Sequence, residues 1–110
     1  MDDLFLKGTT DSDATYAILE AIEKIASEKI HKAPKYSIEI FNQIIQRFPD
    51  NTYKVASAHF GKILCYEELK QHNDALNECE AVLKFPEFSN LTKQIGPIKK
   101  RLIERSVSKD

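Results

Sequence analysis

The stretches "RFPDN" (residues 47–51) and "KFPEF" (residues 84–88) repeat a cation, Phe, Pro and an acid 37 residues apart. Proline cannot continue a helical hydrogen-bond ladder and disfavours helical geometry in the residue before it, so each stretch predicts a helix end. The two preceding segments, "SIEIFNQIIQRFP" (37–49) and "ALNECEAVLKFP" (75–86), align when one residue is dropped near the end. The aligned pairs are Ser37 with Ala75, Ile38 with Leu76, Phe41 with Cys79, Ile44 with Val82, Ile45 with Leu83, and Phe48-Pro49 with Phe85-Pro86.

Hydrophobic residues recur at intervals of three and four through the rest of the chain, which predicts five helices and no strand. The first runs from Ser12 to about Ile30, with "DSD" as its N-cap candidates. Its predicted core face comprises Ile18, Leu19, Ile22, Ile25 and Ala26. The second begins near Pro34 and stops at Pro49. The third follows "PDNT", and the fourth follows the turn "KQHND" and ends at Pro86. The predicted core face of the fourth comprises Ala75, Leu76, Cys79, Val82 and Leu83. A fifth is spaced by Leu91, Ile95, Ile98 and Leu102, and we expect a kink or a restart at Gly96-Pro97.

Composition excludes several classes of protein. The 110 residues are 42% hydrophobic and 30% charged, which is typical of one soluble domain. A net charge of −1 gives no bulk indication of nucleic-acid binding. No apolar run approaches the roughly 20 residues of a membrane span, so membrane insertion is not predicted. Two cysteines form no disulfide framework.

Residues 56–86 resemble the tetratricopeptide repeat family. If Ala75 is the small residue that opens the second helix of a repeat, Tyr66 takes the aromatic position of the first helix and Cys79 a bulky position of the second. The departures are Ile63 where Gly or Ala is usual, Lys70 where Gly is common, and Ser37 in place of Ala in the first copy. A helix pair that recurs with this period is the signature of a solenoid.

The resemblance implies an all-α, TPR-like solenoid of two antiparallel helix pairs and a C-terminal capping helix. Repeat 1 covers about residues 12–49, repeat 2 about 52–86, and the capping helix about 89–105, within a domain at 12–104. We expect residues 1–11 to be a flexible lead-in and residues 106–110 a flexible tail. After the second "FP", Phe88 stands where Asn51 and Thr52 cap a new helix in the first copy. We therefore expect Phe88 to fold back on the core.

One stretch is similar to a narrower group, the tetratricopeptide region of aspartyl/asparaginyl β-hydroxylases. The run Phe60-Gly61-Lys62-Ile63-Leu64-Cys65 is followed by a repeat helix, a Pro-acid turn and a basic Leu-rich helix. This similarity implies a non-catalytic domain of the endoplasmic-reticulum lumen that positions substrate for a larger enzyme. Without it, a cytoplasmic location is favoured.

The family resemblance also implies a function: recognition of another protein or peptide on the concave face, with no catalysis and no cofactor. In the second repeat this face comprises Ser57, Phe60, Leu64, Glu67 and Glu68. Two acids beside apolar side chains favour a ligand with Lys or Arg next to a hydrophobic anchor. The family's chaperone-tail clamp needs Lys and Asn on these helices, so chaperone binding is not predicted. The alternative is an assembly or spacer module, including a homodimer through an uncapped repeat end.

Other chemistries find weaker support in the residues. "HND" at 72–74 matches half of an iron facial triad, but no His follows His72. The set His59, Cys65, His72 and Cys79 lacks the close ligand spacing of zinc sites. A disulfide between Cys65 and Cys79 requires that their helices cross there in an oxidising compartment.

The remaining charged stretches have simpler interpretations than catalysis or nucleic-acid binding. Glu67 and Glu68 are adjacent acids that we interpret as a solvated helix face rather than as acid/base machinery. The basic segment "KKRLIERSVSK" (99–109) lacks interleaved aromatic residues, so we interpret it as the solvent side of the capping helix and predict no nucleic-acid partner.

Overall fold

The computed structural model describes residues 12–107, and this part of the chain is helical with no strand. The predicted all-α class is therefore confirmed. The helices are α1 (Ser12–Glu28), α2 (Pro34–Arg47), α3 (Thr52–Glu68), α4 (His72–Leu83), α5 (Ser89–Thr92) and α6 (Ile95–Val107). The predicted lead-in (1–11), with Asp11 of the "DSD" cap, and residues 108–110 lie outside the described residues. The tail was expected to begin at Ser106, but α6 continues to Val107.

Both Phe-Pro pairs follow helix ends, as predicted. Helix α2 ends at Arg47, two residues before Pro49, and α4 ends at Leu83, three residues before Pro86. Pro34 occupies the first turn of α2, where its missing N–H leaves no hydrogen bond unmade. Helix α3 begins at Thr52, three residues after Pro49, and the side chain of its N-cap residue Asn51 accepts a hydrogen bond from the Lys54 N–H.

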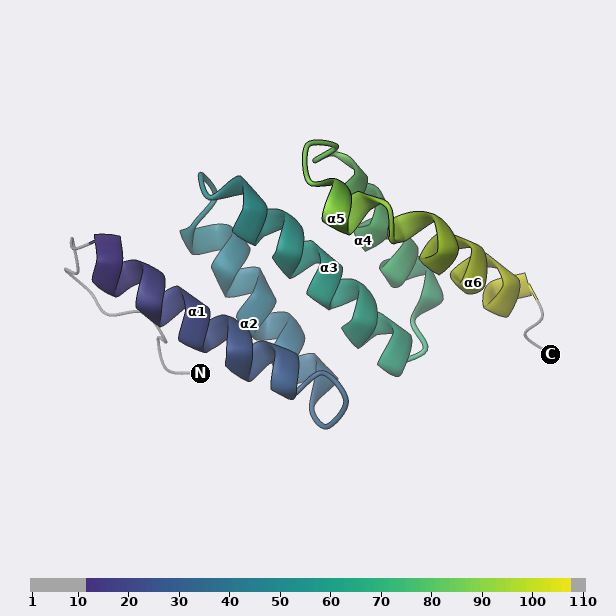
Figure 1. Cartoon of the computed structure of the whole chain (residues 1–110). Helices are drawn as coiled ribbons and strands as arrows, with labels where there is room; N and C mark the ends of the chain where they lie inside the picture. Colours follow the sequence, from purple (N-terminus) through teal and green to yellow (C-terminus); the bar gives the residue numbers. More distant parts are fainter. Residues whose placement is uncertain (1–11, 108–110) are drawn as a thin grey trace.

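The strongest helix contacts join α1 to α2, α2 to α3, α3 to α4, and α4 to α6. Figure 1 shows α1, α3 and the α5–α6 segment in one layer, with α2 and α4 behind them. The molecule is elongated, at 50 × 31 × 18 Å. Helix α3 therefore lies in the middle of the array, and it contributes to the packing on both sides.

Two hydrophobic clusters flank α3. The N-terminal cluster joins α1 and α2 to one side of α3, through Ala58 and Cys65. The C-terminal cluster joins α4, α5 and α6 to the other side, through Ala56 and Ile63. Small side chains on α3 let both neighbouring helices approach closely, and larger ones interlock around them.

Burial agrees with the alignment of the two Phe-Pro segments. The aligned residues Ser37 and Ala75 are both fully buried, as are Ile44 and Val82. Ser37 is polar, and its hydroxyl donates to the carbonyl of Ala26 at 2.8 Å, so no buried hydroxyl is left unsatisfied there. Two predicted core positions are wrong: Ile25 is 41% exposed and Leu83 is 39% exposed.

Gly61 lies where the Phe41 ring of α2 packs against α3. A Cβ atom added to Gly61 would lie 2.3 Å from Cζ of Phe41. The Phe41 ring therefore occupies the space that any other side chain at residue 61 would need. This contact explains a glycine in the middle of a helix, where glycine costs about 1 kcal/mol relative to alanine.

The turn between α3 and α4 contains Lys70, one of the departures from the repeat pattern. Lys70 has φ of 59°, in the left-handed region that favours glycine. The Gln71 N–H donates to the carbonyl of Tyr66, and the Lys70 N–H donates to that of Glu67. These two bonds form a Schellman motif, which satisfies the last carbonyls of α3. Helix α4 then begins at His72, so "HND" lies in its first turn and not, as expected, in the connection.

The C-terminal region differs from the prediction in where the helix restarts. The interruption falls at Lys93 and Gln94, and Gly96-Pro97 lie inside the first turn of α6. Proline is tolerated there because the first-turn N–H groups have no helical partner. The expectation for Phe88 is confirmed: its ring packs against the C-terminal cluster and meets the Tyr53 ring edge-on, with centroids 5.0 Å apart.

Candidate functional site

The five predicted peptide-binding residues share one side of α3, and the structure places them in different settings. Phe60 and Leu64 line an open groove between α3 and α6. Ser57 is half-buried and does not line this groove. Glu67 and Glu68 lie at the C-terminal end of α3, where both carboxylates already have partners. Peptide binding by these residues stays a prediction.

The α3–α6 groove has a volume of about 660 Å³, within the range typical of ligand sites. Phe60 and Leu64 form its α3 side, and Pro97 and Ile98 form its α6 side. Its only charged lining residues are Lys93 and Arg101. The site is therefore an apolar floor with cations along one wall.

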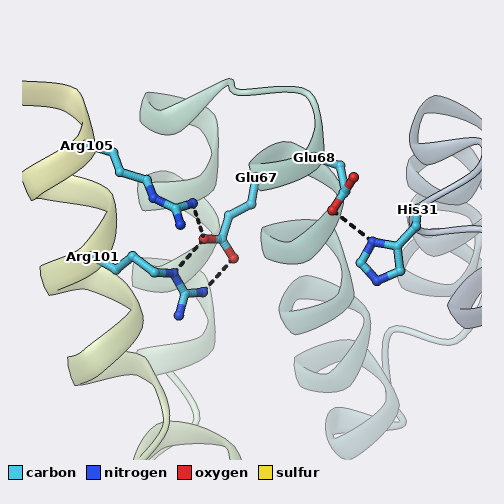
Figure 2. A network of polar contacts seen from close by, with 5 residues as sticks. All are labelled: His31, Glu67, Glu68, Arg101 and Arg105. Carbon is cyan, nitrogen blue, oxygen red and sulfur yellow. Dashed lines mark hydrogen bonds and ion pairs between the residues drawn. The ribbon is translucent and has the colours of Figure 1, made fainter. Parts of the chain in front are cut away.

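Glu67 anchors α6 to α3. Its carboxylate accepts two hydrogen bonds from Arg101, from Nε at 2.9 Å and from Nη2 at 2.8 Å. Arg105 Nη1 lies 3.6 Å from the same carboxylate (Figure 2). The Glu67 side chain is only 11% exposed, whereas those of Arg101 and Arg105 are 43% and 55% exposed. A bidentate pair of this kind fixes the position of the guanidinium as well as neutralising the carboxylate.

Glu68 reaches the opposite way. Its carboxylate lies 2.8 Å from Nδ1 of His31, in the connection between α1 and α2 (Figure 2). The two adjacent acids therefore bridge α3 to different neighbours. The sequence-based expectation that Glu67 and Glu68 together attract a basic ligand does not allow for these pairs, because it took both carboxylates to be free.

A second polar cluster lies between α3 and α4. Glu78 accepts a hydrogen bond at 2.6 Å from Nδ1 of His59, and its other oxygen lies 3.1 Å from Nζ of Lys62. Burial alone would raise the pKa of Glu78, but the contacts with His59 and Lys62 outweigh it and hold that pKa below its usual range. His59, which was weighed above as a zinc ligand, is thus paired with a carboxylate.

The other residues that were weighed above as metal ligands or as a disulfide are likewise not brought together. Within residues 12–107, no group of three His, Cys, Asp or Glu side chains is arranged to hold a metal ion. Cys65 and Cys79 are free and buried in different clusters. Burial raises the pKa of each thiol to about 11, so both remain protonated at neutral pH. The disulfide considered above is not formed.

Sequence reasoning missed the α6 wall of the groove. Lys93, Pro97, Arg101 and Arg105 recur every four residues and so follow one side of this segment. That spacing is visible in the sequence, but the lack of aromatic residues favoured a solvent-facing interpretation of the basic segment. Only the packing of α6 against α4 shows that this side lies across the groove from Phe60 and Leu64.

No protein-family model, curated protein or solved structure matched this chain in our comparisons. The tetratricopeptide and hydroxylase resemblances therefore rest on the residues quoted above. Across residues 12–107, every helix is too short or too polar to cross a bilayer.

Proposed function

We propose that this chain is a non-catalytic peptide-recognition module, built as a TPR-like solenoid of two helix pairs and a terminal helix. Three features support the solenoid: consecutive helices pack together, aligned residues of the two Phe-Pro segments are buried alike, and α1 and α3 lie in the same layer. Two carboxylates of α1, those of Glu20 and Glu23, lie 2.6 and 2.7 Å from Nζ of Lys54 on α3.

The observation that carries the function is the open apolar groove between α3 and α6. Phe60 and Leu64 are only partly buried although they stand beside the two clusters, so part of each side chain is left for a ligand. A peptide that inserts apolar side chains between α3 and α6 would remove this surface from water, which is the main source of affinity in such grooves.

A steric block tests this proposal. Peptides selected from a random library on the full chain should bind the Gln94→Trp variant at least about tenfold more weakly, because the indole would fill the groove. The matched control is Lys100→Trp, which places the same ring on an exposed residue of α6 that does not line the groove. Unchanged binding to Gln94→Trp would show that the selected peptides bind elsewhere, and the proposal would be wrong.

Exposed apolar residues on the first and last long helices favour a second candidate function, assembly through the ends of the array. Ile25 on α1 is 41% exposed, and Ile103 on α6 is 48% exposed. An uncovered end of a helical repeat can stack on another copy. Sedimentation at several concentrations tests this candidate: association that is lost in Ile103→Glu supports it, and a monomer at all concentrations excludes it.

A further inference from the structure

The charges that border the α3–α6 groove determine which peptides fit it. Lys93 and Arg101, its charged lining residues, are both cations. An adjoining hollow of about 370 Å³ shares Leu64 and Arg101 with the groove and is also lined by Arg105, Glu67, Glu68 and His31. Glu67 is paired with two guanidinium groups, so its carboxylate offers no unmatched negative charge to a ligand, and the Glu68 carboxylate is directed away from α6, to His31 (Figure 2).

The guanidinium groups still have hydrogen-bonding capacity. An arginine side chain carries five N–H donors, and Arg101 contacts Glu67 through Nε and one terminal nitrogen only. In Figure 2 the other terminal nitrogen of Arg101 lies outside the pair. Because Glu67 holds the guanidinium in place, a carboxylate that binds the remaining donors loses less conformational freedom on binding.

We propose that the groove binds an acidic–apolar segment of a partner protein: two or three large hydrophobic residues with Asp or Glu beside them. The apolar side chains would contact Phe60, Leu64 and Ile98, and the acids would contact Lys93 and Arg101. Charge complementarity supports this occupant, because both charged side chains that line the groove are cations and would repel a basic segment. The inference rests on the proposed function and reverses the ligand charge expected from Glu67 and Glu68.

A pair of matched peptides tests the charge preference. Both are acetylated and amidated, so that neither has a free terminal carboxylate, and both carry the same Leu and Phe residues. One has Asp and Glu at the flanking positions, and the other has Lys there. We expect the acidic peptide to bind the full chain at least about tenfold more tightly in low salt, with the difference shrinking in high salt as the charges are screened.

Charge reversal locates the binding site. Lys93→Glu should weaken the acidic peptide at least about fivefold, and Lys100→Glu, an equal charge change outside the groove, should weaken it less than about twofold. Tighter binding of the Lys-flanked peptide, or equal binding with no effect of Lys93→Glu, would overturn the acidic preference while leaving peptide recognition standing. If neither peptide nor any library-selected peptide binds, the proposed function itself fails.

Two other occupants would overturn the inference. The chain contains an acidic–apolar stretch of its own at residues 2–6, "DDLFL". If Leu4→Ser combined with Phe5→Ser raises the affinity for the acidic peptide about tenfold or more, this stretch competes for the groove and a partner segment is not its main occupant. Sedimentation that shows a dimer abolished by Lys93→Glu would instead identify a second copy of the chain as the occupant.

Discussion

The two hydrophobic clusters on either side of α3 are built from aligned segments, yet they are filled differently. At three aligned positions α2 has Ser37, Ile40 and Phe41, of which Ile40 and Phe41 belong to the N-terminal cluster. The corresponding residues of α4 are Ala75, Glu78 and Cys79. A large ring and an aliphatic side chain are thus replaced by a thiol and a carboxylate. The comparison shows that the same helix pairing accepts either an aliphatic side chain and a ring at these two positions, or a carboxylate that forms ion pairs and a thiol.

The largest expected effect is the difference in lost stability between truncating Ile40 and truncating its aligned counterpart, Glu78. Ile40 is fully buried, so Ile40→Ala should lower the free energy of unfolding by about 2–5 kcal/mol through lost burial and the cavity left behind. Glu78→Ala should cost less, because its carboxylate lies at the edge of the core. Urea unfolding followed by circular dichroism measures both. If Glu78→Ala costs as much as Ile40→Ala, the two clusters do not differ as described.

The next effect concerns the glycine that Phe41 requires. Gly61→Ala should destabilise the protein by roughly 1–3 kcal/mol, because the added Cβ overlaps the Phe41 ring despite the better helix propensity of alanine. Gly96→Ala is the control: a Cβ added at residue 96 would meet no heavy atom within 4 Å, so we expect little change or a small gain. A second change, Phe41→Leu, should recover part of the loss in Gly61→Ala. Full stability of Gly61→Ala would contradict the packing of α2 on α3.

The ion-pair cluster of His59, Lys62 and Glu78 between α3 and α4 should make the stability of the protein depend on pH. Glu78→Gln should cost about 1–2 kcal/mol at neutral pH, between the values for exposed and buried pairs. The folded-state pKa of Glu78 is lowered, so its contribution is present above the ordinary glutamate pKa of about 4.3 and is lost as pH falls through the lowered value. The difference between wild type and Glu78→Gln should therefore shrink in acid, and a constant difference would contradict the assigned pairing.

The smallest effect is a gain in stability at the α3–α4 turn. Lys70 has a positive φ, which costs about 1 kcal/mol for a residue with a Cβ atom. Lys70→Gly removes this strain but adds freedom to the unfolded chain, so we expect a net gain of about 0.5 kcal/mol. Lys70→Ala, which keeps the Cβ, serves as the control and should not be stabilising. Thermal unfolding of the three proteins would show the order.

The sequence by itself determined the helices, their ends and much of the core. Local signals carry this information: apolar spacing defines the buried side of each helix, and proline stops a helix through its own backbone geometry. The same signals predicted Phe88 on the core and the unusual residue at Lys70. They placed the start of α6 too late, at Gly96-Pro97. They also assigned Ile25 and Leu83 to the core, because the burial of one residue depends on which neighbouring helix covers it.

Only the tertiary structure decided the character of the candidate site. Glu67 and Glu68 are adjacent in sequence, but Glu67 turns to Arg101 on α6 and Glu68 turns to His31, 37 residues away. Whether a carboxylate is free or neutralised depends on charges brought close by folding, and no local pattern encodes that distance. The groove is likewise formed by two helices that α4 and α5 separate in the sequence. Local spacing therefore predicted which residues lie on each helix face, and packing decided which charges that face presents.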